Sequence, residues 1–270
     1  MRKRQQRIYI DAALCAEALG SKDSTEGLAL ALLVKLTFVN SRVECASVTR
    51  MMGIFGIGFG RCRRAVEAAL RCGYLRRDGE ALVACRLRGA DGLNYCVGVE
   101  RRTVGVSGVC RAPMSLTQAC DIIRGAAIAC HVARQQNLFD TLELATAPEG
   151  RGGWLRMRSA RRKLGRLGMR AEDVDGSGRR LSYASMMERA GCSRSKARLV
   201  ARGLVAQGVL RAEECWEATG LDARDLDGEF VARWRRSGLG GFPLRRGGSV
   251  QVRRANEYFV AEGAVRWLHG

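Results

Sequence analysis

Arginine side chains recur at helical spacing in two stretches of this chain, and they are its most chemically informative residues. The planar guanidinium group donates paired hydrogen bonds that match phosphate oxygens and the O6 and N7 atoms of guanine. Such residues therefore indicate binding of a polyanion. The basic residues are Arg61, Arg63, Arg64 and Arg71 in the first stretch and Arg194, Lys196, Arg198 and Arg202 in the second.

Residues suited to metal or acid–base chemistry are few and poorly spaced. The only histidines are His131 and His269, and the eleven cysteines form no Cys-x-x-Cys pair, so we expect reduced cysteines rather than a zinc site. The glycine-rich stretch 53–60 has no Lys-Ser or Lys-Thr ending, which excludes the usual phosphate-binding loop. We find no pair of carboxylates placed for catalysis. The sequence predicts no enzyme, no metal and no cofactor.

The net charge points to an anionic partner. The 270 residues include 46 Lys and Arg against 27 Asp and Glu, a formal charge of +19, and only five of the basic residues are lysine. A GC-rich genome would also favour arginine over lysine, so that choice alone has two explanations. The excess is unevenly distributed, because residues 151–170 hold eight basic side chains and no acid, whereas residues 213–229 hold seven acids. We expect nucleic acid as the partner.

The sequence predicts neither a membrane span nor a secretory signal. The longest uncharged run, residues 51–60, has ten residues, whereas a spanning helix needs about 20. The basic residues 1–7 are followed by a short apolar stretch that contains Asp11, unlike a signal peptide. We expect a cytoplasmic prokaryotic protein, associated with the nucleoid or with a plasmid.

An internal repeat relates the two arginine-bearing stretches. Residues 60–76 and 195–211 match at an offset of 135 (208 − 73), and each contains a glycine followed by an apolar pair, at Gly73 and Gly208. At 100° per residue each stretch forms a helix with one apolar and one basic face, although Leu199 falls on the polar side. The residues expected to be buried are Cys62, Ala65, Val66, Ala69 and Leu70 in the first helix and Ala197, Val200, Ala201, Leu204 and Val205 in the second.

A shorter helix and a turn precede each of these helices. In the second copy the helix begins near Tyr183, and Gly191-Cys-Ser193 forms a turn in which Ser193 caps the next helix. The pattern resembles the helix-turn-helix of winged-helix DNA-binding proteins over residues 185–211. The first copy, which begins at Ser47, is expected to differ by a longer turn over residues 54–59.

The resemblance implies recognition helices that enter the major groove and basic hairpins, or wings, that contact the backbone. Asp78-Gly79 is a strong hairpin turn, and residues 249–260 suit the outer strands of the second wing, after an acidic and then basic helical excursion over residues 213–236. The predicted DNA-binding residues are Arg61, Arg63, Arg64, Arg71, Arg76, Arg77, Ser193, Arg194, Ser195, Lys196, Arg198, Arg202, Arg245, Arg246, Arg253 and Arg254.

The predicted fold is mainly α with small β-hairpin wings, an α+β class. Two winged-helix domains, residues 1–112 and 180–270, are joined by a helical basic connector, residues 113–179. Core helices are expected over residues 24–40 and 115–133, the second opened by a capping box, and a basic helix over residues 154–169. In that basic helix Arg161, Arg162 and Lys163 either contact the DNA backbone or form an ordinary solvated face.

The tandem arrangement is similar to that of plasmid and phage replication initiators built from two winged helices. This resemblance implies sequence-specific binding to repeated sites at a replication origin, by a monomer or homodimer that also meets replication or transcription proteins. Two alternatives stay open. One is a transcriptional regulator of a mobile element, and the other is a winged-helix module that docks onto proteins.

Overall fold

The computed structural model of the protein describes residues 5–38, 40–89, 92–100, 111–146, 181–237 and 241–268. Contacts within the chain define two compact units. The first comprises Met1–His131, Met186–Val209 and Val260–Gly270, and the second comprises Val132–Ser185 and Leu210–Phe259. These units follow spatial contacts rather than the order of the chain, and the linear domain boundaries after residues 112 and 179 stay a prediction.

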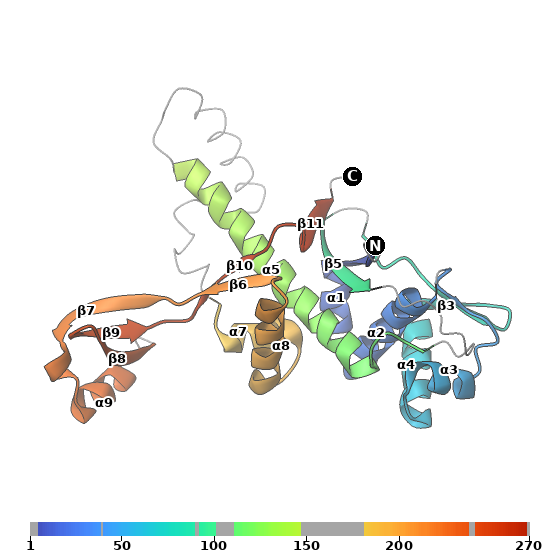
Figure 1. Ribbon diagram of the computed structural model, residues 1–270, viewed down its shortest axis with the longest axis horizontal. Helices are drawn as coiled ribbons and strands as arrows, with labels where there is room; N and C mark the ends of the chain where they lie inside the picture. Colours follow the sequence, from blue (N-terminus) through green and yellow to red (C-terminus); the bar gives the residue numbers. More distant parts are fainter. Residues whose placement is uncertain are drawn as a thin grey trace, which may run out of the picture. The chain divides into compact units, whose positions relative to one another are not determined.

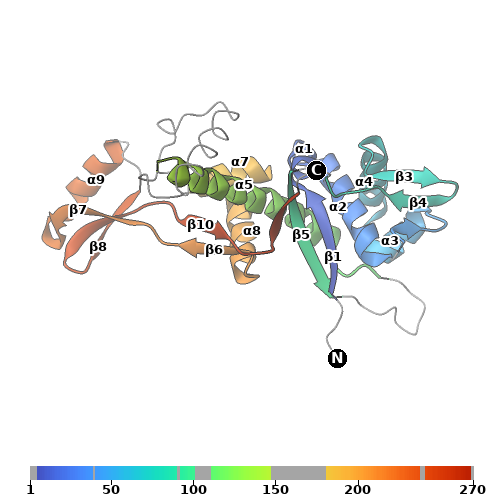
Figure 2. The ribbon, with the colours of Figure 1, turned by 90° about the horizontal axis from the view of Figure 1, so that it is seen from above.

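A three-stranded antiparallel sheet in the first unit joins parts of the chain that are far apart in sequence. Strand β1 (Gln5–Asp11) pairs with β5 (Gly92–Glu100), and β11 (Val265–Leu268) pairs with the other edge of β5. Figure 2 shows β1 and β5 side by side. The sequence analysis did not predict this sheet, which lies beyond the expected hairpin wings.

Helix α2 (Lys22–Thr37) is the core helix of the first unit and follows the short helix α1 (Ala12–Ala18). Its residues 25–34 are all buried, so the helix is surrounded by protein. The hydroxyl of Ser21 accepts a hydrogen bond from the backbone N–H of Ser24 at 3.0 Å. This contact caps the helix, which begins two residues before the predicted start. The prediction of a core helix here is confirmed.

A second small sheet lies beside two further helices of the first unit. Strand β2 (Arg42–Val43) precedes α3 (Val48–Phe55) and α4 (Phe59–Arg71), and the hairpin of β3 (Leu75–Asp78) and β4 (Ala81–Ala84) follows them. The strand order is β2-β4-β3, and Figure 1 shows the hairpin next to α3 and α4. Gly79 has a φ of 59° in the turn, as the predicted Asp-Gly hairpin requires.

Helix α5 (Leu116–Thr146) opens with the predicted capping box. The backbone N–H of Gln118 donates to the Ser115 hydroxyl at 3.2 Å, and the N–H of Ser115 donates to the Gln118 side chain at 2.8 Å. The helix continues past the predicted end at residue 133. The expected basic helix, with Arg161, Arg162 and Lys163, lies outside the described residues.

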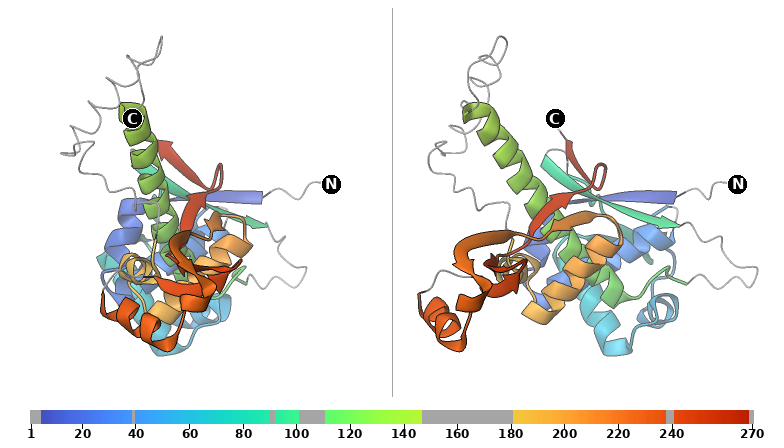
Figure 3. Two further views of the ribbon diagram at one scale, coloured as in Figure 1. Left: turned by 90° about the vertical axis from the view of Figure 1, so that its left-hand side faces the viewer. Right: turned by 60° about the vertical axis from the view of Figure 1, so that its left-hand side comes forward.

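The last part of the repeat is formed by α7 (Tyr183–Ala190), α8 (Arg194–Ala206) and β6 (Leu210–Glu213), and β6 pairs with β10 (Glu257–Val260). Helix α8 belongs to the first unit and β6 to the second. The second unit holds the sheet β7 (Trp216–Asp222), β9 (Ser249–Arg253) and β8 (Phe242–Arg246), with α9 (Gly228–Arg236) beside it in Figure 3. The predicted helical excursion is therefore wrong for residues 216–222. These residues form a strand because they complete the sheet against β9, with Glu217 opposite Val252.

The protein thus has the predicted α+β class, with small antiparallel sheets. Its strands are more numerous than two hairpin wings would require. No helix within the described residues combines the length and the apolar character needed to cross a bilayer.

Gly27 marks the closest approach of α2 to α4. A Cβ atom at this position would lie 2.8 Å from the backbone N of Ala69 and 3.1 Å from the carbonyl carbon of Ala68. We expect Gly27→Ala to lower the free energy of unfolding by about 2 kcal/mol, because backbone atoms cannot move aside as a side chain can. Gly53→Ala is the control, since its Cβ would meet nothing within 4 Å in helix α3, and it should stabilise by about 0.5–1 kcal/mol. Urea unfolding measures the free energy of unfolding of both variants. Equal changes in the two variants would contradict the close approach of α2 to α4 at Gly27.

Two buried acids of the first unit make its stability sensitive to alkali. Burial raises the pKa of the Cys120 thiol to about 11 and the pKa of the Tyr95 hydroxyl to about 12. The unfolded chain releases these protons at lower pH, so the stabilisation is full below about pH 9 and is lost as the pH rises through 11 and 12. We expect about 2 kcal/mol to disappear for each group, measured by urea unfolding between pH 8 and 12. Cys120→Ala should remove part of this pH dependence of stability. A stability that stays constant between pH 8 and 12 would contradict the raised pKa values of these two groups.

Candidate nucleic-acid interface

The two stretches that repeat in sequence also repeat in structure without a gap. Helices α3 and α4 begin at residues 48 and 59, α7 and α8 begin at residues 183 and 194, and one offset of 135 (183 − 48) covers both. A glycine with positive φ follows the first helix of each copy, Gly56 at 63° and Gly191 at 54°. The longer turn predicted for the first copy is wrong, because Ile54 and Phe55 belong to α3 and Phe55 is buried.

Helices α4 and α8 also end in the same way. Gly73 and Gly208 have φ values of 72° and 68°, and the next residue in each copy donates a backbone hydrogen bond at 2.8 Å to the carbonyl of Ala69 or Leu204. This is the predicted left-handed glycine termination. At the start of α8 the Ser193 hydroxyl accepts from the backbone N–H of Lys196 at 3.3 Å, so Ser193 acts as a helix cap.

Helix α8 presents an exposed basic face. Arg194, Ser195, Arg198 and Arg202 are exposed, whereas the predicted apolar positions are buried except Val205, which is 38% exposed. The helix contains no acid, and no ion pair joins its three arginines to any carboxylate in the described part of the chain. Two cations, Arg194 and Lys196, stand in its first turn, where the helix dipole disfavours positive charge. A surface selected only for stability would avoid this arrangement, so the face is suited to an anionic ligand.

Helix α4 presents a mixed face. Arg63, Arg64 and Arg71 are exposed, but Arg63 Nε lies 2.7 Å from Glu67 Oε1 one helical turn away. That hydrogen bond raises the pKa of the Arg63 guanidinium. The acid lowers the positive charge of this face relative to that of α8.

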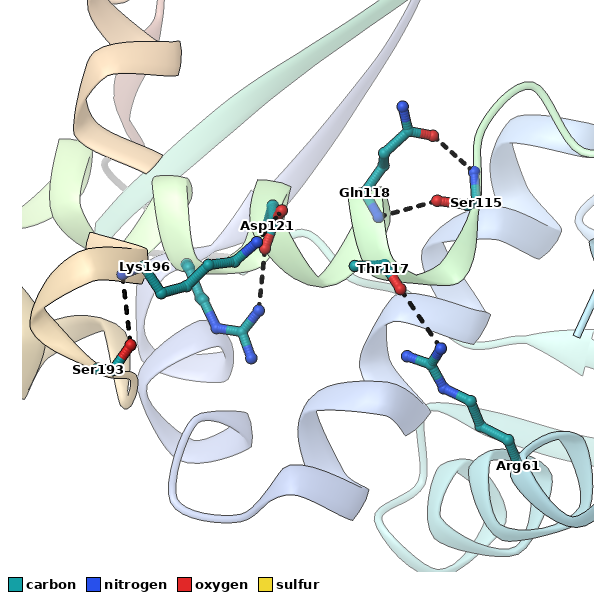
Figure 4. Close-up of polar contacts among 8 residues, drawn as sticks. Arg61, Ser115, Thr117, Gln118, Asp121, Ser193 and Lys196 are labelled. Carbon is teal, nitrogen blue, oxygen red and sulfur yellow. Dashed lines mark hydrogen bonds and ion pairs between the residues drawn. The ribbon is translucent and has the colours of Figure 1, made fainter. Parts of the chain in front are cut away.

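Arg61 and Lys196 occupy equivalent positions of the repeat, since 196 − 61 = 135. Each forms an ion pair with an acid of another helix. Arg61 Nε lies 3.1 Å from Oε1 of Glu26 on α2, a side chain that is only 4% exposed, and Arg61 Nη1 donates to the Thr117 hydroxyl at 3.3 Å. Lys196 Nζ lies 2.7 Å from Oδ2 of Asp121 on α5. Figure 4 shows the start of α5 meeting Arg61 through Thr117 and Lys196 through Asp121. Both cations therefore position the start of α5 against α4 and α8, and their contact with DNA stays a prediction.

These ion pairs were not anticipated from the sequence. The available signal was Glu26, an acid just before the leucine-rich part of its helix, because a buried carboxylate requires a partner. Asp121 also meets Arg124 Nη1 at 3.0 Å, within α5. The partner of neither acid can be named without the tertiary fold.

The predicted wing residues differ in their surroundings. Arg76 and Arg77 are exposed on β3. The side chains in the second unit have contacts there: Arg245 Nη2 donates to the Leu226 carbonyl at 2.8 Å, and the Arg246 guanidinium lies 4.5 Å from the centre of the Trp216 ring. Arg253 and Arg254 form ion pairs with Glu214 and Glu217 at 2.7 and 2.8 Å. Of the predicted wing residues, Arg76 and Arg77 are the more available to a ligand.

The described residues contain no group of three or more His, Cys, Asp or Glu side chains that could hold a metal ion. Comparisons of the chain with protein-family models, with curated proteins and with solved structures found no match. The functional assignment therefore depends on the geometry of the repeat and on the charge of its exposed helix faces.

Proposed function

We propose that this protein binds double-stranded DNA sequence-specifically, with α8 as its principal recognition helix and α4 as a second one. The observation that carries the proposal is the exposed face of α8. Its three arginines follow a tight turn between α7 and α8 and form no ion pair with any carboxylate of the described residues. Arginine at such positions contacts guanine edges in the major groove, and neighbouring cations contact phosphates.

The order of the elements also supports the proposal. In the first copy a core helix, a short strand, two helices and a hairpin follow one another, as in winged-helix proteins, and Arg76 and Arg77 lie on that hairpin. In the second copy α5, α7, α8 and β6 follow one another as α2, α3, α4 and β3 do in the first, and β10 replaces the immediate return strand after the inserted sheet. Both recognition helices contact the start of α5, which keeps them at a fixed separation.

The proposed setting is replication initiation on a plasmid, phage or other mobile element, because two such modules in one chain can read adjacent major-groove segments without a second copy. We propose transcriptional regulation of such an element as the second candidate. Binding to tandem repeats at an origin favours the first setting, and binding over the gene's own promoter favours the second.

Selection of bound duplexes from random and genomic DNA, followed by footprinting of the selected sequence, tests the proposal. Because neutralised phosphates release counterions, the logarithm of the binding constant should fall linearly with the logarithm of salt concentration. We expect a footprint of about two major-groove turns. No enrichment together with salt-insensitive binding would contradict DNA recognition and would favour the protein-docking alternative.

A further inference from the structure

Leu199 is the most exposed large apolar side chain among the described residues. It is 62% exposed and lies in the middle of α8, whereas Val200 and Leu204 of the same helix are buried. A leucine at this position gives α8 only partial packing within the protein. Its position on the exposed face therefore calls for a contact outside the chain.

The neighbours of Leu199 are polar or basic groups of the same face. Ser195 lies four residues before it and Arg202 three residues after it, the spacings that place side chains next to one another on a helix. Both neighbours are exposed, and on its other side Leu199 borders a cavity together with Lys196 and Gly203. An apolar group at the edge of an exposed arginine face fits a surface that combines negative charge with isolated apolar patches.

The major groove of DNA is such a surface. The 5-methyl group of thymine is its apolar feature, set among hydrogen-bonding base edges and between two rows of phosphates. We infer that Leu199 is a specificity-determining residue that contacts a thymine methyl group in the part of the site read by α8, beside a guanine read by Arg198 or Arg202. This inference rests on the proposed function and deepens it.

The first copy of the repeat offers different chemistry at the same positions. At the offset of 135, Arg64 stands in place of Leu199, Glu67 in place of Arg202, and Phe59 in place of Arg194. Phe59 is 56% exposed. The most exposed apolar side chains of the two helices, Phe59 and Leu199, therefore stand at repeat positions more than one helical turn apart. The two halves of the DNA site are therefore unlike in sequence, and the thymine requirement belongs to the half bound by α8.

The experiment replaces thymine by deoxyuridine, which lacks only the 5-methyl group. The probe is the duplex obtained by selection with the full-length protein, with each thymine of the footprint replaced singly. We expect the dissociation constant to rise about fourfold at one thymine in the α8 half, the effect of exposing one buried methyl-sized group, and to stay unchanged at thymines in the α4 half.

A substitution then assigns the effect to Leu199. Leu199→Ala should bind the thymine and deoxyuridine duplexes equally, whereas Leu199→Met should keep the difference because it keeps an apolar side chain of similar reach. Val205→Ala is the matched control, since Val205 is also exposed on α8 but lies near the end of the helix, and it should leave the difference unchanged. Leu199 is 62% exposed, so both Leu199 variants should unfold near the temperature of the wild type.

The outcomes separate this inference from the proposed function. If no duplex is selected, DNA recognition itself fails. If a duplex is selected and Arg198→Ala weakens it, but Leu199→Ala leaves every thymine-to-deoxyuridine difference unchanged, the methyl contact is overturned. Leu199 would then belong to a protein partner, seated on the cavity of about 350 Å³ that Leu199 borders together with Lys196 and Gly203.

Discussion

The double substitution Arg198→Ala/Arg202→Ala is expected to weaken binding to the selected duplex about 100-fold while leaving the fold intact. Both side chains are exposed on α8 and form no ion pair within the described residues, so their removal leaves no buried group without a partner. A bidentate contact between arginine and a guanine edge contributes about 1–3 kcal/mol of discrimination. Two such contacts account for the expected loss.

The matched control removes two positive charges from another exposed helix. Arg233 and Arg236 of α9 are exposed, so Arg233→Ala/Arg236→Ala changes the net charge equally. Fluorescence anisotropy with the selected duplex and with a scrambled duplex measures both variants. The α8 variant should lose the difference between the two duplexes, and the α9 variant should keep it. Equal losses for both variants would show that the binding depends on net charge alone.

The sequence predicts Arg194, Lys196, Arg198 and Arg202 together as DNA contacts. The double substitution leaves Lys196 in place because its ammonium group is paired with Asp121. It targets Arg198 and Arg202 because both are exposed on a helix that contains no acid. The contribution of Arg161, Arg162 and Lys163 stays a prediction, since they lie outside the described residues.

Local signals made the repeat predictable. The glycines that end α4 and α8, the Ser193 cap and the apolar spacing act within one or two helical turns, so the two helices and the β3–β4 hairpin could be placed from the sequence. The first turn was misjudged because Gly53, Gly56 and Gly58 all break helices in isolation. Burial of Phe55 at 3% exposure favours the helical conformation of α3 up to that residue.

Contacts between distant segments could not be predicted in the same way. Strand β11 pairs with β5, which lies more than 160 residues earlier in the chain (265 − 100 = 165). The composition of neither strand identifies the other as its partner. The acids that pair with Arg61 and Lys196 could not be predicted for the same reason. A helical projection correctly places both cations at the border of the polar face, but the acids that they meet belong to α2 and α5, which approach only in the folded chain.

The substitution Arg61→Ala is expected to lower the free energy of unfolding by about 3 kcal/mol, although Arg61 was predicted to contact DNA. Its guanidinium is 37% exposed, but the Glu26 side chain that it pairs with is 4% exposed, and a buried carboxylate left without its cation is strongly destabilising. The neighbouring Arg63→Ala also removes one ion pair of α4, but that pair is exposed on both sides, so no measurable change in unfolding is expected.

A double-mutant cycle decides whether the Glu26 charge causes this loss. Glu26→Gln in the Arg61→Ala background should recover much of the stability, because a neutral amide costs less to bury than a carboxylate. DNA affinity, measured at a temperature at which every variant is folded, should change little in Arg61→Ala relative to Arg198→Ala. If Arg61→Ala instead unfolds like Arg63→Ala and loses DNA affinity, then Arg61 leaves Glu26 to contact the duplex. The role predicted from the sequence would then be the correct one.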